Sequence, residues 1–196
     1  MITRWLTGMI RPGTGVGIGA GPIVKLGGSL LTRPAWPEDV RRLVDSLRSP
    51  VVVVGGGPVV DGLREIDAAN PRSTVLMHAL AIDAMRLTAR IAAEALRLPL
   101  EPMVESHAAT PIILDTPTWL EESSFANRLP EGWGVTSDSL AAIIAGAAGR
   151  GLLLVKSLPP PCPGDALADL SAAGWIDEHF PAAAADVTAI GWAAPA

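Results

Sequence analysis

The sequence predicts an α/β fold, a three-layer αβα sandwich around a mainly parallel open sheet. Short apolar runs alternate along the chain with segments of helical periodicity, as they do when helices connect and cover parallel strands. The run 51–54 contains only valine and ends in three glycines, the pattern of a central parallel strand that leads into a turn. The 196 residues are enough for one domain with a substantial core.

The expected elements follow in chain order. Residues 37–47 are predicted to be helical because Val40, Leu43 and Val44 recur on one face. The expected strands are 23–26, 51–54, 111–114, 152–155 and a terminal strand at 186–190. The other expected helices are 58–69, one or two helices within 73–98, a short helix or turn at 118–125, a small-residue helix ending near 148, and 165–172.

Residues 1–21 are expected to form a flexible leader ahead of a single domain at 22–196. The leader has Arg4 and Arg11 around a short apolar patch, followed by a glycine-rich run, and this pattern lacks the apolar core of a secretory signal. Its alternating glycines do not match a dinucleotide-binding fingerprint, because such a fingerprint follows a strand and here the strand comes afterwards.

Composition limits the partners that the protein can have. The net charge of −5 and the scattered arginines argue against a nucleic-acid surface, and no apolar run reaches the roughly 18 residues of a membrane span. Cys162 is the only cysteine, which excludes an intrachain disulfide and a cysteine metal cluster. We therefore expect a cytoplasmic protein that acts on a small molecule.

Lysine is rare in this chain, which has thirteen arginines and two lysines. Each lysine closes an apolar run beside small residues: Lys25 precedes Gly27, Gly28 and Ser29, and Lys156 precedes Ser157. A compact ammonium at a strand end, next to glycine amides, suits the binding of phosphate. The alternative is that codon bias removed lysine and left two by chance.

These signals are expected to meet at one edge of the sheet. Ligands bind at the carboxyl ends of the strands in open α/β sheets, and Gly55, Gly56 and Gly57 follow a second strand there. The three signals predict a phosphate-transfer site, although either glycine run alone could be a tight structural turn. Neither run matches the ordinary P-loop pattern.

Asp138 has two interpretations. It stands at the start of a helix, where Ser137 or Asp138 could act as the cap, or its carboxylate could orient the two lysines or bind the magnesium of a nucleotide. His78 is more often, in a helix of this kind, a packing or hydrogen-bonded core residue than a catalyst. Asp61 is either a charge at a helix start or a contact for a cationic substrate group, and Trp133 is either a loop anchor or a cover for a ring-shaped ligand.

These motifs resemble the amino-acid kinase superfamily, which includes acetylglutamate, aspartate and uridylate kinases. The similar segments are 24–29, 51–57 and 138–141. The resemblance implies the αβα sandwich, ATP with Mg²⁺ as donor, Lys25 as stabiliser of the transferring group and Asp138 as organiser of the lysines. It also implies that Gly27, Gly28, Ser29, Lys156 and Ser157 bind the nucleotide and that Gly55, Gly56, Gly57 and Ser137 line the acceptor site.

A narrower resemblance is to the short kinases that phosphorylate aminomethylfuran phosphate in methanofuran-type cofactor synthesis, and to their bacterial one-carbon relatives. It rests on the segments 56–61, 78–85, 129–139 and 153–157. By this likeness Lys156 faces the nucleotide phosphates, and Asp61 or Asp83 meets the amine of the substrate.

One departure from the family pattern leaves other functions open. Lys156 and Ser157 are followed by Leu158 and three prolines, which remove amide donors where the family has a nucleotide-binding turn. The alternatives are a noncatalytic nucleotide-binding or assembly protein and a kinase for uridylate or an acidic amino acid. Homo-oligomers are expected, through helices in 79–95 or through the opening helix.

Overall fold

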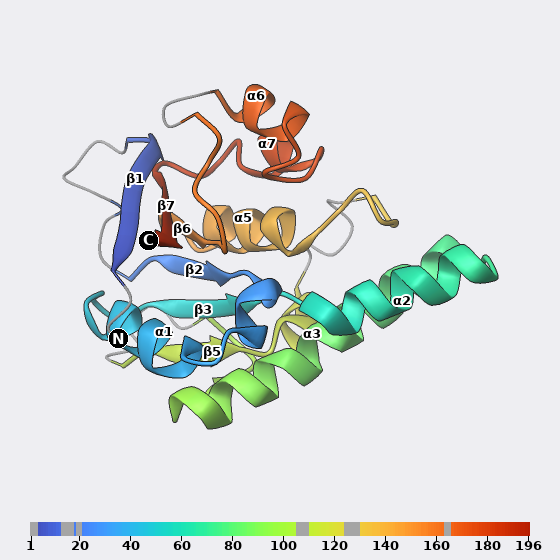
Figure 1. Ribbon diagram of the computed structural model, residues 1–196, viewed down its shortest axis with the longest axis horizontal. Coiled ribbons are helices and arrows are strands. Elements are labelled where there is room, and N and C mark those ends of the chain that lie inside the picture. Colours follow the sequence, from blue (N-terminus) through green and yellow to red (C-terminus); the bar gives the residue numbers. More distant parts are fainter. Residues whose placement is uncertain (1–3, 13–17, 19–20, 105–109, 124–129, 163–165) are drawn as a thin grey trace.

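A computed structural model describes residues 4–12, 18, 21–104, 110–123, 130–162 and 166–196. The described strands form one seven-stranded sheet of order β1-β7-β6-β2-β3-β5-β4. Neighbouring strands pair in parallel, apart from the antiparallel pair of β1 and β7. The predicted α/β sandwich with a mainly parallel sheet is confirmed (Figure 1).

The central strands agree closely with the sequence prediction, whereas the last strand lies further along the chain than expected. The segment 186–190 was predicted as the terminal strand, but the strand begins at Ile190. The strands are β1 (Trp5–Arg11), β2 (Ile23–Leu26), β3 (Val51–Val54), β4 (Leu100–Glu101), β5 (Ile112–Leu114), β6 (Leu152–Val155) and β7 (Ile190–Pro195).

The helices lie close to their expected positions, and the segment 73–98 contains one continuous helix. No described helix is both long enough and apolar enough to cross a membrane. The helices are the 3-10 helix η1 (Gly28–Thr32), α1 (Trp36–Asp45), α2 (Gly57–Ala69), α3 (Thr74–Leu96), α4 (Thr116–Glu122), α5 (Ser137–Ala147), α6 (Leu167–Ala172) and α7 (Phe180–Ala183).

The expectation of a flexible leader at 1–21 is wrong for its first half. Strand β1 pairs with β7 from Trp5 to Arg11 and closes one edge of the sheet. Arg11 also donates hydrogen bonds to the carbonyls of Ala184 and Val187, at 2.6 and 2.8 Å. This pairing joins the two ends of the chain, and a reading of local sequence pattern cannot detect it.

Alternating side chains of the central strands build two cores. Ile23, Val51 and Leu152 face α5 and α7 on one side of the sheet, while Val24 and Val52 face α1 and α3 on the other. Because side chains alternate along a strand, Lys25 lies on the same face as Ile23. The strand therefore directs its one charged side chain toward α5.

The sheet order places a topological switch point between β2 and β6. From β2 the chain builds the β3-β5-β4 side, and it then returns to β6 and β7 on the opposite side. The amide of Gly27 donates to the carbonyl of Val155 at 2.8 Å, so the two strands end next to each other. Such a point is where open α/β sheets bind ligands.

Candidate active site

Lys25, Asp138 and Lys156 form a charged cluster at the switch point. The ammonium of Lys25 lies 2.8 Å from Asp138 Oδ1, and that of Lys156 lies 2.7 Å from Asp138 Oδ2. Each carboxylate oxygen therefore faces one lysine. The two lysines of the chain and one aspartate, 113 and 18 residues away from them, form one site, which we call the charged triad.

The triad is largely removed from water. The side chains of Lys25, Asp138 and Lys156 are 7%, 6% and 16% exposed. Burial alone would raise the pKa of the Asp138 carboxyl, but the charges of Lys25 and Lys156 outweigh burial and hold that pKa below its ordinary value. Burial lowers the pKa of Lys156, and the Asp138 charge offsets part of this effect.

The start of α5 decides between the two interpretations of Asp138. Thr136 is the N-cap, and its hydroxyl accepts from the amide of Asp138 at 3.2 Å. Neither Ser137 nor Asp138 is the cap, so the capping interpretation is wrong. The Asp138 carboxylate instead faces the two lysines, as the alternative interpretation required.

The two predicted glycine loops touch each other beside the triad. A Cβ on Gly28 would lie 2.2 Å from Gly57 N, and one on Gly55 would lie 2.7 Å from Ser137 Oγ. Gly57 has a φ of +52°, a conformation that favours glycine. Helices α2 and α5 begin at this contact, so their positive ends add to the field that favours an anion.

The close approach of the loops makes Gly28 intolerant of substitution. In Gly28→Ala the new methyl group would meet only backbone atoms, Gly57 N and Cα and Gly55 O, at 2.2 to 2.6 Å. We expect urea denaturation to show a loss of at least about 1–3 kcal/mol in unfolding free energy. Gly62→Ala is the matched control, because nothing lies within 4 Å of its Cβ position. Equal stability of the two variants would contradict this packing.

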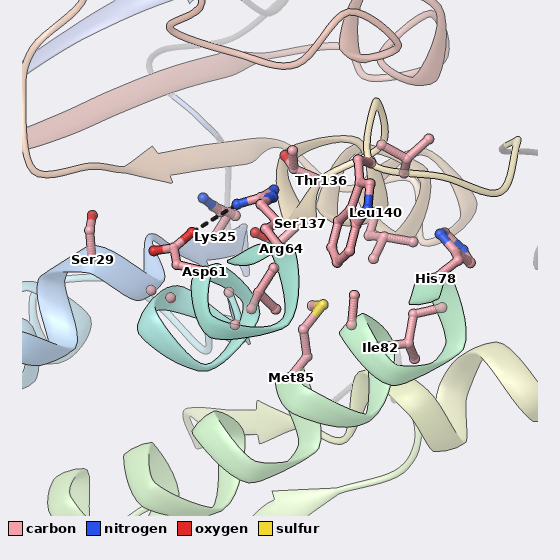
Figure 2. A pocket seen from close by; sticks show the side chains of 18 of the residues that line it. Lys25, Ser29, Asp61, Arg64, His78, Ile82, Met85, Thr136, Ser137 and Leu140 are labelled. Atoms are coloured by element: carbon pink, nitrogen blue, oxygen red, sulfur yellow. Dashed lines mark hydrogen bonds and ion pairs between the residues drawn. The ribbon is translucent and has the colours of Figure 1, made fainter. Parts of the chain in front are cut away.

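A cavity opens on the Lys25 side of the triad, and we call it the Lys25 cavity. Its floor holds Met85 and Ile82 from α3, with Leu140 of α5 opposite them (Figure 2). The Asp61–Arg64 ion pair, with 2.9 Å between Oδ1 and Nη1, lies near Lys25, and His78 lies at the other end. The predicted residues Gly28, Ser29, Gly55, Gly56, Gly57 and Ser137 also line it.

Trp133 and Arg64 form a further wall of the Lys25 cavity. The Arg64 guanidinium lies 5.3 Å from the centre of the Trp133 ring, within cation–π range. The indole nitrogen of Trp133 donates to Asp67 Oδ2 at 2.8 Å. The structure thus fits both interpretations of Trp133, because the ring is anchored and also faces the cavity. Arg64 had not been singled out from the sequence.

Two expectations about residues of α3 need correction. Asp83 was expected to meet the substrate, but it does not line the cavity; its carboxylate is largely exposed and lies 3.8 Å from Arg86. The cavity-lining positions of α3 are His78, Ala81, Ile82 and Met85, which share one helical face. His78 is therefore a cavity residue and not only a packing residue, and its Nδ1 accepts from the Gly132 amide at 3.3 Å.

A second cavity, the Lys156 cavity, lies on the other side of the triad. Asp138 and Lys156 line it together with Trp175 and Asp177, and Trp133 and Thr136 line both cavities. The triad thus lies between the Lys25 cavity and the Lys156 cavity. Ser29 and Ser157, both predicted to bind the nucleotide, meet nearby with 3.3 Å between their hydroxyl oxygens.

Trp175, which also lines the Lys156 cavity, contacts the Lys156 ammonium. The Lys156 ammonium donates to the Trp175 carbonyl and lies 4.6 Å from the centre of its ring. The indole of Trp175 donates to the carbonyl of Leu158 at 3.1 Å. The segment ahead of the three prolines is therefore tied to the same tryptophan. Trp175 and Asp177 had not been singled out, because they belong to a short irregular segment without periodicity.

The site fits a phosphate-bearing ligand better than a metal ion bound by protein ligands alone. Lys25, Lys156 and the glycine amides suit phosphate oxygens. Within the described ranges, no three His, Cys, Asp or Glu side chains are grouped so that they could hold a metal ion, and Asp138 is occupied by the lysines. A Mg²⁺ ion would be carried mainly by nucleotide phosphates and water, which is common for this ion.

A comparison with known protein families matches the first half of the chain. The model of the Amino acid kinase family matches residues 22–118, slightly less than half of the chain. The matched range includes Lys25, both glycine loops and α3 but ends before Asp138 and Lys156. No curated protein sequence matches the chain.

Solved kinases have the same fold. Uridylate kinase from Archaeoglobus fulgidus superposes with a TM-score of 0.58 at 15% identity, covering 88% of this chain and 90% of that one. UMP kinase from Ureaplasma parvum superposes with a TM-score of 0.57 at 11% identity, covering 88% of this chain and 98% of that one. Aspartate kinase from Synechocystis superposes with a TM-score of 0.59 at 16% identity, covering 90% of this chain but 40% of that one. The chain therefore has the fold found in these kinases.

Proposed function

We propose that this protein is an ATP-dependent small-molecule kinase of the amino acid kinase family. The observation that carries the proposal is the charged triad, in which one buried carboxylate holds two ammonium groups between two cavities. A kinase must bring two anionic substrates together and stabilise the charge of the group that passes between them. Two cavities joined by two cations meet this requirement.

Positioning and charge account for the catalysis. Phosphoryl transfer asks for little covalent help from the protein, so cations fixed before the reaction can lower the barrier. Lys25 faces the acceptor side and Lys156 the nucleotide side. Gly27 and Ser157 lie beside Lys156, whereas Gly28 and Ser29 line the Lys25 cavity, so these four residues would contact the nucleotide where its phosphates pass between the two cavities. Asp138 keeps both ammonium groups in place. MgATP supplies the γ-phosphoryl group.

The site favours an acceptor that is already an oxyanion. The Asp138 carboxylate is paired with two lysines, and Asp61 is paired with Arg64, so neither is suited to act as a general base. His78 lies at the far end of the Lys25 cavity (Figure 2). A phosphate or carboxylate needs no deprotonation in order to attack, whereas an alcohol does. This supports a phosphate or carboxylate acceptor.

We propose aminomethylfuran phosphate as that acceptor. The Lys25 cavity offers an aromatic ring in Trp133, a cation in Arg64 and an acidic group in Asp61, which suit a furan ring, a phosphate and an amine. Gly55, Gly56, Gly57 and Ser137 complete the contacts. The resemblance in residues 56–61 and 78–85 supports the same choice. Uridylate and acidic amino acids are the alternative acceptors.

The experiment that tests this function is ADP release from MgATP by the purified protein. The panel of acceptors is aminomethylfuran phosphate, uridylate, acetylglutamate and aspartate. The proposal expects the highest kcat/KM with aminomethylfuran phosphate. A preference for another member would retain the kinase and replace its acceptor, and no turnover with any of them would reject the kinase function for this panel.

Arg64 gives a prediction about the acceptor. Arg64→Ala should raise the KM for the phosphate-bearing acceptor at least about tenfold with little change in kcat, since a hydrogen bond to a charged group contributes about 1.5–3 kcal/mol. Arg90→Ala is the matched control, because Arg90 lies exposed on α3 outside the cavity lining. Steady-state kinetics with varied acceptor measures the effect. An unchanged KM in Arg64→Ala would place the acceptor phosphate elsewhere.

One observation favours a second candidate, a noncatalytic nucleotide-binding or assembly protein with this fold. Lys156 is already engaged by Asp138 and by the Trp175 carbonyl, and the prolines after Leu158 provide no amide donors. Binding of ATP without turnover of any acceptor would support this candidate.

A further inference from the structure

Asp177 lies at the centre of a hydrogen-bond network next to the triad. Within the described part of the chain its carboxylate accepts five hydrogen bonds. They come from the Thr136 amide at 3.1 Å, the Thr136 hydroxyl at 2.7 Å, the Ser139 amide at 3.2 Å, the Ser139 hydroxyl at 2.5 Å and the His179 amide at 3.1 Å. Four of these donors belong to the start of α5.

The network includes residues before and after Asp138 in the chain. Thr136 and Ser139 flank the first residues of α5, and Asp177 binds the backbone of both. The Thr136 hydroxyl donates to Asp177 and also accepts from the Asp138 amide at 3.2 Å. A chain of two hydrogen bonds therefore connects the Asp177 carboxylate with the backbone of Asp138. A shift of Asp177 would move the residue that holds both lysines.

Asp177 is itself fixed by the core. Ile176 before it is 3% exposed, and Phe180 beyond it is fully buried. Both side chains belong to the core on the α5 face of the sheet. Two residues earlier, the Trp175 carbonyl accepts from Lys156. The segment 175–177 thus holds Lys156 through one residue and the helix that carries Asp138 through another.

We propose that Asp177 is a positioning residue that fixes the start of α5, so that Asp138 holds Lys25 and Lys156 in one geometry. Its activity readout rests on the kinase function proposed above, whereas its structural readout does not. Burial lowers the pKa of Lys156, and the Asp177 charge offsets a small part of this lowering, beside the larger effect of Asp138. Among the described residues, no hydrogen bond joins Asp177 to either lysine, so it acts through Thr136, Ser139 and Asp138.

The test uses the two lysines of the chain as probes. Lysine labelled with ¹³C and ¹⁵N should give two side-chain ammonium signals in NMR spectra of the full chain, and Lys156→Gln assigns them. In Asp177→Asn, an amide NH₂ group, which donates, replaces one of the two carboxylate oxygens, which accept. The surrounding amides and hydroxyls that donate to that oxygen then lose their acceptor. We expect the Lys25 and Lys156 signals both to shift and Lys156 to titrate at a lower pH than in the wild type.

The matched control is Asp169→Asn, which removes a charge of the same kind from an exposed position on α6. We expect this variant to keep both lysine signals and the wild-type kcat. Asp177→Asn should lose about tenfold or more in kcat, because small misplacements of catalytic groups are costly, while the KM for the acceptor stays within about twofold. Such a division between kcat and KM is expected for a positioning residue.

The outcomes separate the two proposals. If Asp177→Asn shifts the lysine signals but the wild type turns over no acceptor, the role of Asp177 is supported and the kinase function is rejected. Wild-type lysine signals in folded Asp177→Asn would overturn the role of Asp177, whatever the activity. If Asp177→Asn does not fold, Thr136→Val removes the connecting hydroxyl alone, and unchanged lysine signals in that variant would overturn the proposal equally.

Discussion

Lys25→Ala is expected to lower kcat by at least about 10²-fold while the affinity for MgATP changes far less, because the ammonium acts mainly on charge that develops during transfer. Lys25 is buried, lines the Lys25 cavity and is paired with Asp138 at 2.8 Å. Single-turnover kinetics and equilibrium titration of the nucleotide measure the two quantities separately.

Lys25→Arg is the informative companion of this variant. It keeps the positive charge but replaces a compact ammonium by a larger planar guanidinium, at a buried position where the Lys25 ammonium lies 2.8 Å from Asp138 Oδ1. We expect it to remain at least about tenfold slower than the wild type. Full activity in Lys25→Ala would contradict the role assigned to Lys25.

Asp138→Asn is expected to have the largest effect on stability. It would leave two buried ammonium groups facing each other without their counter-ion, and breaking a buried ion pair in this way costs about 3–5 kcal/mol. Urea denaturation at neutral pH measures the loss. The triple variant Lys25→Met, Asp138→Leu, Lys156→Met removes all three charges and should be more stable than Asp138→Asn alone. The reverse order would show that the charges of the triad do not determine its stability.

The Asp138 carboxyl also predicts how the stability of the wild type changes with pH. The pKa of Asp138 is lower in the folded protein than its ordinary value of 3.8. Its contribution to stability is therefore complete above pH 3.8 and is lost as the pH falls through the lower folded-state value. Asp138→Asn should remove this part of the acid dependence.

The central strands and their charged ends could be predicted from the sequence for a physical reason. A strand buried on both faces is a continuous apolar run, so Lys25 and Lys156 stand out where such runs end. The mutual contact of Gly28 and Gly57 also follows from the parallel pairing of β2 and β3. These signals are local, and the sheet brings them together.

The features that the sequence analysis missed depend on contacts between distant segments. Strand β1 is defined by its pairing with β7, and its own residues lie next to a glycine-rich run. Asp83 was chosen by residue type, although it follows Ile82 by one position and thus points about 100° away from that cavity-lining residue. Asp177 resembles any acidic residue in a loop until the fold brings it to the start of α5.

The measurement that tests the central claim most directly is the transfer of ³²P from γ-labelled ATP to the acceptor, by wild-type protein and by Lys25→Ala under the same conditions. The triad as the centre of phosphoryl transfer predicts labelled aminomethylfuran diphosphate from the wild type and at least about 10²-fold slower labelling by the variant. Labelled acceptor formed at the same rate by both proteins would contradict it.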